Sequence, residues 1–355
     1  MARQYKAGLR KTPNGSVIDG EGNLLYISCQ RFIRDIAEGD CCFMCGAKPG
    51  SRPFNDEHVI PDWVLRDLGL HNKQINHGNF RSTTYSRFRV PCCVECNSTL
   101  GRKVETPIST LFKGGPQAMR ERLTKEGPWS IFAWLNLVYL KFLLFDRSVR
   151  IHRDPRNGAE TIGQAFDWSS LHHLHCVARA YLTEPEIDHR IMGSTFFVSM
   201  KRYEGDEPFD WCDIYADRVI MFRFRDIAVI SVLDDACATY TKVIDPLFLK
   251  LVGPLSPPQL RELTLRIADA RHHINETALF HTEFDFDLRV ARISVEHPDT
   301  VTFHQNEPDY FGRLMEMFCS GYVLGQKDEQ QKLRYLREGR WSFLFDPNGD
   351  VKPAP

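Results

Sequence analysis

Two closely spaced pairs of cysteines constrain this chain more than any other feature of its sequence. The first pair is Cys42 and Cys45, and the second is Cys93 and Cys96. Two pairs with this spacing are typical of a structural zinc site, in which four thiolates surround one ion tetrahedrally. We therefore predict that Zn²⁺ closes the 47-residue segment between the pairs and contributes folding free energy to a small domain.

Other interpretations of these cysteines stay open. Cys41 and Cys92 directly precede the pairs and could replace Cys42 and Cys93, although only the latter two leave two-residue gaps. Buried free thiols or a redox pair would also produce a cysteine-rich segment. The basic first six residues are followed by no apolar stretch, so we expect no signal peptide, no disulfides and a cytoplasmic protein.

The two parts of the chain carry opposite net charge. Residues 1–127 contain 19 Lys and Arg against 13 Asp and Glu, whereas the remainder contains 26 against 33. A basic part that holds the cysteines suits a polyanion such as nucleic acid, although a chance asymmetry of solvated faces would look the same. The 355 residues suffice for two domains, and we predict a first domain at 1–125 and a second at 126–355.

An acidic residue and a histidine, Glu57 and His58, stand next to each other between the cysteine pairs. The apolar pattern predicts a strand over 57–60 and a second strand over 87–90. A helix is expected over 98–112, directly after Asn97, the residue that follows the second cysteine pair. The expected order is therefore strand, strand and helix around a carboxylate, an imidazole and an amide.

These residues resemble the HNH endonuclease family. The match consists of Glu57-His58-Val59-Ile60-Pro61 and Cys93-Val94-Glu95-Cys96-Asn97, and it covers roughly residues 40–115. The resemblance implies a ββα-metal fold, so the fold class that we expect is α+β, an HNH domain with a four-cysteine zinc site followed by a second α+β domain. Two departures are visible: the acid is Glu rather than the commoner Asp, and the family's middle asparagine has no clear equivalent among Asn72, Asn76 and Asn79.

The resemblance further implies a metal-dependent endonuclease that hydrolyses phosphodiester bonds of DNA. His58 would be the general base, and Glu57 and Asn97 would hold Mg²⁺ or Mn²⁺ through hard oxygen atoms. Nucleases of this family with an additional domain often act in bacterial antiviral defence. Two alternatives stay open: a non-catalytic zinc module that binds nucleic acid, and an RNase that uses the same residues.

Strand geometry leaves the ligand set open. Successive side chains of a strand leave opposite faces, so Glu57 and His58 diverge unless the strand is bent, and Asp56 shares the face of His58. Glu105 lies about two helical turns after Asn97, where we expect a solvated carboxylate, with metal ligation as the alternative. The resemblance favours Glu57 over Asp56.

Basic side chains near the expected site would neutralise phosphates without reading bases. The candidates are Arg81, Arg87, Arg89, Arg102 and Lys103. An ordinary charged surface is the alternative for each of them.

The second domain, 126–355, is expected to recognise a protein partner or to regulate the first. Its segment 129–145 is largely apolar, but it contains Asn136 and Lys141 and is short for a bilayer, so we predict a buried core helix and no membrane partner. We also expect a loop over 69–83, a link over 116–128 and a loose tail from Asp346. A metal cluster at 172–176, His-His-Leu-His-Cys, is not expected, because successive residues of one element cannot all face one ion.

Overall fold

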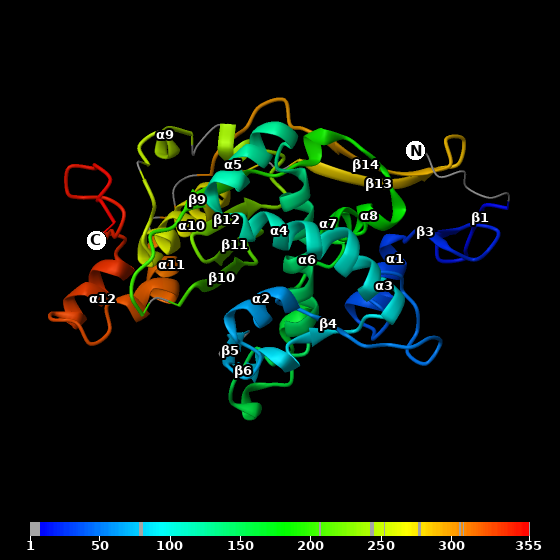
Figure 1. Ribbon diagram of the computed structural model, residues 1–355, viewed down its shortest axis with the longest axis horizontal. Coiled ribbons are helices and arrows are strands. Elements are labelled where there is room, and N and C mark those ends of the chain that lie inside the picture. Colours follow the sequence, from blue (N-terminus) through cyan, green and yellow to red (C-terminus); the bar gives the residue numbers. More distant parts are fainter. Residues whose placement is uncertain are drawn as a thin grey trace. The chain divides into compact units, whose positions relative to one another are not determined.

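The structure is a computed structural model that describes residues 8–77, 81–205, 207–241, 245–251, 253–275, 278–304, 307 and 309–354. The predictions about the first six residues and about Asn79 lie outside these ranges. Helices and several small sheets alternate along the chain, which confirms the α+β class (Figure 1). The chain divides into two compact units that interleave in sequence. Unit 1 comprises Met1–Lys113, Trp129–Ile191 and Phe280–Val295, and unit 2 comprises Gly114–Pro128, Met192–Leu279 and Glu296–Pro355.

Unit 1 is built from short strands and from helices that flank them. Its strands are β1 (Arg10–Lys11), β2 (Val17–Ile18), β3 (Leu24–Tyr26), β4 (Glu57–His58), β5 (Gln74–His77), β6 (Arg81–Thr84), β7 (Arg89–Val90), β8 (Glu186–Ile187), β13 (Leu279–Asp285) and β14 (Val290–Glu296). Its helices include α1 (Cys29–Arg31), η1 (Phe32–Ala37), α2 (Asp62–Leu68), α3 (Val94–Leu100), α4 (Thr106–Lys113), α6 (Trp129–Asp146), α7 (His172–Ala178) and α8 (Ala180–Thr183). The strands pair as β1-β2-β3, β13-β14-β8, β4-β7 and β5-β6.

The expected order of strand, strand and helix is present in unit 1. Strand β4 pairs antiparallel with β7, so that Glu57 lies opposite Val90 and His58 lies opposite Arg89. Helix α3 begins at Val94, four residues after β7 ends. Both strands are shorter than expected, because residues 59–60 leave the ladder and Tyr85–Arg87 forms a 3₁₀ turn.

One nearly continuous helical segment follows the second cysteine pair. It consists of α3, a π-helical segment η4 (Gly101–Glu105) and α4, so the expected helix is confirmed and extended in both directions. Pro107 lies in the first turn of α4 and has no backbone N–H to donate to the preceding turn. The π-helical turns of η4 lie just before this proline, and they accommodate the irregular hydrogen-bond pattern of the helical segment.

The predicted loop over 69–83 is wrong at residues 74–77 and 81–83. Strands β5 and β6 form an antiparallel hairpin there, with Gln74 opposite Thr84 and His77 opposite Arg81. Residues 78–80 at its turn lie outside the described ranges. The ring of His77 hydrogen-bonds the Asp146 carboxylate of α6 across 2.8 Å. The polar sequence of this segment does not predict the strand pair, because the hairpin is held by a contact with a helix that is distant in the sequence.

Helix α6 is the core helix of unit 1. It is long and apolar enough to cross a membrane by length and composition alone, but 72% of its span is buried inside the protein. The two polar residues in its interior, Asn136 and Lys141, are fully buried as well. The prediction of a buried core helix over this segment is therefore confirmed. A cytoplasmic location stays a prediction.

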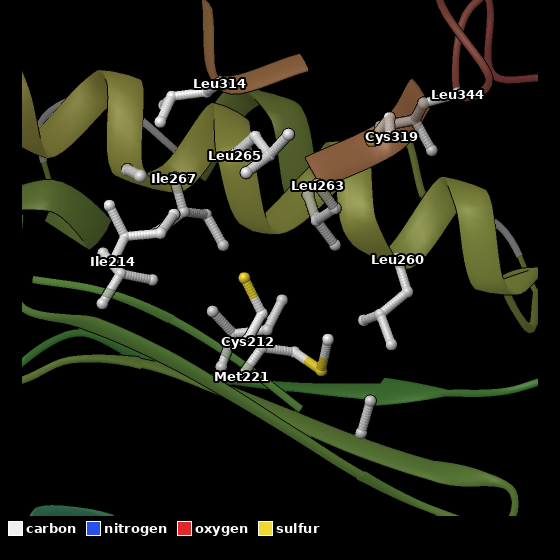
Figure 2. Close-up of a cluster of buried hydrophobic side chains, with 14 of the residues drawn as sticks. Cys212, Ile214, Met221, Leu260, Leu263, Leu265, Ile267, Leu314, Cys319 and Leu344 are labelled. Atoms are coloured by element: carbon white, nitrogen blue, oxygen red, sulfur yellow. The ribbon is translucent and has the colours of Figure 1, made fainter. Parts of the chain in front are cut away.

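Unit 2 has a four-stranded antiparallel sheet in the order β10-β11-β12-β9. Its strands are β9 (Thr195–Ser199), β10 (Phe209–Ile214), β11 (Val219–Phe224) and β12 (Ile227–Val232), and its helices include α5 (Gly115–Glu126), α9 (Asp245–Phe248), α10 (Pro257–His272), α11 (Tyr310–Cys319) and α12 (Glu329–Arg337). Side chains of α10 such as Leu260 and Ile267 point toward Cys212 and Met221 of the sheet (Figure 2). The apolar face of this helix thus buries one face of the sheet.

Two expectations about segments of unit 2 are wrong. Residues 116–128, expected to be a link, largely form α5, whose Arg120 donates a hydrogen bond to the hydroxyl of Ser199 in β9. The tail from Asp346 is held rather than loose. The Gln259 side chain donates to the Lys352 carbonyl, and Lys201 donates to the Ala354 carbonyl.

Candidate functional site

The four predicted cysteines form a compact cluster. The sulfur atoms of Cys42, Cys45, Cys93 and Cys96 lie within 4.8 Å of one another, and those of Cys45 and Cys93 are 3.8 Å apart. Four sulfurs held about 2.3 Å from a tetrahedral zinc ion are about 3.8 Å apart from each other. The geometry therefore suits zinc, and the cluster contains Cys42 and Cys93 rather than the neighbouring Cys41 and Cys92.

The chain turns sharply around the first pair. Gly46 has φ +65°, a conformation that favours glycine, and its N–H donates to the carbonyl of Cys42 across 2.8 Å. At the second pair, the N–H of Asn97 donates to the carbonyl of Cys93 as α3 begins. An ion held by these sulfurs would therefore fix the backbone position of Asn97.

The four thiols perturb one another. Hydrogen bonds from neighbouring thiols, first that of Cys45, lower the pKa of Cys42 far below its usual range. The same contact with Cys42 raises the pKa of Cys45 to about 12. Hydrogen bonds among the thiols stabilise the thiolate of Cys42. A zinc ion would hold all four cysteines as thiolates.

Two side chains at the end of helix α7 donate hydrogen bonds to the backbone of the first cysteine turn. The ring of His175 donates to the carbonyl of Phe43 across 2.8 Å, and Arg179 donates to the carbonyl of Met44. Burial lowers the pKa of Arg179 below its usual range, against the opposing effect of nearby cysteines that include Cys45 and Cys96. A buried guanidinium beside a site of four thiolates and one divalent ion offsets part of their net negative charge.

Both ring nitrogens of His172 in α7 are hydrogen-bonded within unit 1. The Nε2 atom of His172 hydrogen-bonds the carbonyl of Ile27, and its Nδ1 atom pairs with the hydroxyl of Thr282. Within the described ranges, no group of residues 172–176 forms a set of side chains that could share one metal ion.

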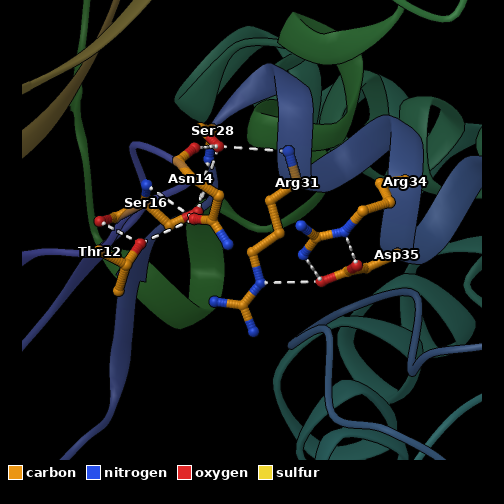
Figure 3. Close-up of polar contacts among 7 residues, drawn as sticks. All are labelled: Thr12, Asn14, Ser16, Ser28, Arg31, Arg34 and Asp35. Atoms are coloured by element: carbon orange, nitrogen blue, oxygen red, sulfur yellow. Dashed lines mark hydrogen bonds and ion pairs between the residues drawn. The ribbon is translucent and has the colours of Figure 1, made fainter.

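A polar network at the N-terminal end of unit 1 holds the segment that leads into the first cysteine turn (Figure 3). The Ser28 hydroxyl accepts from the N–H of Arg31 and donates to the carbonyl of Asn14, so it caps α1 and ties it to the β1–β2 turn. Both Arg31 and Arg34 bind Asp35, and the carbonyl of Asp35 accepts from the N–H of Cys41.

A hollow of about 760 Å³ lies next to Asn97, the residue that follows the second cysteine pair. It is lined by residues of β4, of α2 and of the helical segments from α3 to α4. Two of the three predicted catalytic residues, Glu57 and Asn97, line it, and His58 does not. The other lining residues are Asp62, Trp63, Arg66, Asp67, Gly101, Glu105, Thr106, Ser109, Thr110 and Lys113.

The orientation of the Asn97 amide follows from its partners. Its Nδ2 atom donates to Asn55 Oδ1 across 3.0 Å and to the backbone carbonyl of Asp56 across 3.1 Å. Because a carbonyl can only accept, the nitrogen must face Asp56 and the oxygen must face the other way. That oxygen has no hydrogen-bond partner among the described residues and is a candidate metal ligand. The Asp56 side chain is exposed and is not among the residues that line the hollow.

Glu57 belongs to a buried charge network that the sequence does not reveal. Lys141, on the fully buried part of α6, donates to Glu57 Oε1 across 3.1 Å and to the carbonyl of His58 across 2.8 Å. Its ammonium nitrogen is also 3.8 Å from Glu105 Oε1. One buried cation thus serves two carboxylates, and one oxygen of Glu57 is already taken.

The expectation that Glu105 is a solvated carboxylate is wrong. Its side chain is 11% exposed, and its Oε2 atom accepts from the Trp63 indole N–H across 2.9 Å. Burial raises the pKa of Glu105 to about 7, against the opposing effect of the Lys141 charge. Its Oε1 atom is buried without a hydrogen-bond partner, and Glu105 is among the residues that line the hollow.

His58 lies on the opposite face of β4 from Glu57, as strand alternation requires. Its side chain is 13% exposed, and its Nδ1 atom is 3.8 Å from Asp62 Oδ1. Burial lowers the pKa of His58 to about 4, helped by the nearby charge of Arg89. The ring is therefore neutral at pH 7. The candidate supports Asn72 and Asn76 are exposed, and Asp62 and His71 lie beside the ring.

The five predicted nucleic-acid-binding residues are exposed in unit 1. They are Arg81, Arg87, Arg89, Arg102 and Lys103. The Arg89 guanidinium donates to the carbonyl of Ser86, and Lys103 donates to the carbonyl of Tyr181. Within the described ranges none of the five forms an ion pair, so their charges are available to a polyanion.

Sequence reasoning missed several polar residues of the hollow and its surroundings. They are Asp62, Arg66, His71, Lys113 and Lys141. A signal existed for Lys141, since a lone lysine in an apolar helix must find a carboxylate when it is buried. Asp62 follows His58 by four residues at the start of α2, but nothing in the sequence places His71 beside them.

A scan against protein-family models finds no family that matches this chain, and searches of curated proteins and of solved structures find no match. The resemblance to HNH endonucleases therefore depends on the motifs described above.

Proposed function

We propose that unit 1 is a metal-dependent endonuclease of the HNH type that hydrolyses phosphodiester bonds of DNA. The observation that carries this proposal is that Glu57 and Asn97, separated by 39 residues of sequence, line one hollow beside a zinc-type cysteine cluster. The β4–β7–α3 order agrees with a ββα arrangement.

In this proposal the hollow receives the scissile phosphate and a Mg²⁺ or Mn²⁺ ion. The ligands are the outward-facing oxygen of Asn97 and the Glu57 oxygen that Lys141 does not occupy. The ion, when bound, supplies positive charge to the phosphate oxygens in the transition state. Arg66 and Lys113 line the same hollow, and each is paired with an aspartate that a phosphate could replace.

His58 is assigned the role of general base. A neutral imidazole at pH 7 can accept the proton of an attacking water, and the Nε2 atom of His58 has no hydrogen-bond partner among the described residues. Because the ring leaves the opposite face of β4 from Glu57, the base step requires the ring or the strand end to move toward the hollow when substrate binds.

The test is cleavage of supercoiled plasmid and of single-stranded RNA by the full chain with Mg²⁺, with Mn²⁺ and with EDTA. We expect cleavage of plasmid with either ion, a loss of about 10²- to 10⁴-fold for His58→Ala, and a comparable loss for Asn97→Ala. The exposed residues His152 and Asn157 provide matched controls as His152→Ala and Asn157→Ala.

The outcomes separate the alternatives. Cleavage of RNA alone would favour the RNase, and binding of nucleic acid without cleavage under any ion would favour the non-catalytic zinc module. Equal activity of His58→Ala and His152→Ala would remove His58 from the mechanism. A role in antiviral defence predicts that bacteria producing the wild type resist phage plaque formation and that bacteria producing His58→Ala do not.

A further inference from the structure

Unit 1 contains a second group of side chains that could hold a metal ion, distinct from the cysteine cluster and from the oxygen ligands of the hollow. It consists of His58, Asp62 and His71, each of which offers one ligand atom within 4.8 Å of the others. Among the described residues these three and the four cysteines are the groups with this property. We propose that His58, Asp62 and His71 form a site for one divalent transition-metal ion.

The distances support a shared ion. The His71 Nε2 atom is 2.9 Å from Asp62 Oδ1, and the His58 Nδ1 atom is 3.8 Å from the same oxygen. Ligand atoms held about 2.1 Å from one ion are roughly 3.0–3.5 Å apart, so the observed separations lie on either side of this range. Small rotations of the two rings would place all three atoms around one centre.

The three ligands are anchored in different ways. Strand β4 carries His58, whose carbonyl is held by Lys141. The first turn of α2 carries Asp62, whose second carboxylate oxygen is 2.8 Å from the Arg66 guanidinium, which leaves the first oxygen for the ion. The carbonyl of His71 accepts from the N–H of Ser86, so the loop after α2 is fixed as well. Held outer contacts of this kind orient metal ligands.

The chemistry of the donors selects the kind of ion. Two imidazoles and one carboxylate suit Zn²⁺, Co²⁺, Ni²⁺, Mn²⁺ or Fe²⁺, whereas Mg²⁺ prefers oxygen ligands alone. A single negative charge and two nitrogens favour the later ions of the divalent series. The site should therefore prefer Co²⁺, Ni²⁺ or Zn²⁺ to Mg²⁺.

The site has a consequence for the proposed nuclease, and this consequence rests on the proposed function. An ion on the Nδ1 atom of His58 takes a lone pair of the ring, and the remaining nitrogen then carries the proton. The ring can no longer accept a proton from water. Co²⁺, Ni²⁺ or Zn²⁺ at this site should therefore inhibit cleavage supported by Mg²⁺, and the site would regulate the reaction through the base itself.

The direct test is a titration of the zinc-loaded full chain with Co²⁺, followed by the visible absorption of the bound ion and by elemental analysis of retained zinc. We expect one Co²⁺ per chain in addition to one zinc, and no such Co²⁺ in His71→Ala or Asp62→Asn with the zinc retained. Asn97→Ala and the exposed control His152→Ala should bind Co²⁺ like the wild type.

Several results would overturn the site. These are a wild-type chain that binds zinc at the cysteines and no further Co²⁺, or Co²⁺ binding that is unchanged in His71→Ala. Retained zinc and an unchanged circular dichroism spectrum show that a variant is folded. The binding result stands independently of cleavage, so an inactive wild type that binds Co²⁺ through His71 would refute the nuclease and leave the site intact.

Discussion

Lys141 is the buried cation of the candidate site, and its removal tests the charge network there. Its side chain is fully buried, and it is the cation for Glu57 at 3.1 Å and the nearest cation to Glu105 at 3.8 Å. Substitution Lys141→Met keeps an unbranched side chain of similar length and leaves two buried carboxylates without their cation. Breaking a buried ion pair in this way costs about 3–5 kcal/mol of unfolding free energy, which is roughly a 10 °C fall in Tm for a domain of this size.

The assay is thermal and urea unfolding of the wild type, Lys141→Met and the exposed control Lys11→Met at pH 7.5 with EDTA. We expect Lys11→Met to match the wild type and Lys141→Met/Glu57→Gln to regain part of the loss, because the double variant removes the Glu57 charge that has lost its cation. Mg²⁺ should stabilise Lys141→Met more than the wild type, since both oxygens of Glu57 are then free. A loss below about 1 kcal/mol for Lys141→Met would refute the reasoning.

Three further predictions concern other parts of unit 1. First, elemental analysis should find about one zinc per chain. Cys96→Ser should lose the zinc and unfold the segment around the second pair, visible as rapid tryptic cleavage at Arg89 and Arg102; zinc retained in this variant would contradict the assigned ligands. Second, the raised pKa of Glu105 gives a stability contribution that is complete below about pH 4.5 and is lost as the pH rises through 7. Glu105→Gln should therefore become more stable relative to the wild type by up to about 3 kcal/mol between pH 4.5 and pH 8, measured by urea unfolding, and a difference that does not vary with pH would show that Glu105 stays ionised. Third, Arg87→Gln should lower the slope of log binding constant against log salt for duplex DNA by about 1, measured by fluorescence anisotropy, whereas Arg156→Gln, already paired with Asp154, should leave it unchanged.

The sequence predicts those features of the candidate site that depend on local spacing. Two-residue gaps place Cys42 with Cys45 and Cys93 with Cys96, and the turns that bring each pair together are local, so the cluster could be predicted before its geometry was known. The helix after Cys96 and the apolar helix α6 were predictable for the same reason, because each has a periodic or continuous pattern.

Contacts between distant segments account for what the sequence does not predict. The hairpin of β5 and β6 has polar residues on its exposed face, and it is held through His77 by Asp146, which lies 69 residues later. Glu105 looks solvated on a helix with charged neighbours, and it is buried because Trp63 and Lys141 approach it from two other elements. Such approaches depend on tertiary packing, and local propensity does not encode them.

In the proposed nuclease, substrate binding on the Glu57 face of β4 must affect His58, which leaves the opposite face of the strand. Lys141 holds both residues, since it binds the carboxylate of Glu57 on one side and the backbone carbonyl of His58 in the same strand. A phosphate and a metal ion entering the hollow would add positive and negative charge beside Glu57 and weaken its bond to Lys141. The same ammonium group donates to the carbonyl of His58. A weaker bond between Lys141 and Glu57 would therefore alter the position of the His58 backbone and of its imidazole ring. The buried lysine is thus the physical link by which substrate binding on one face of the strand could reposition the base on the other.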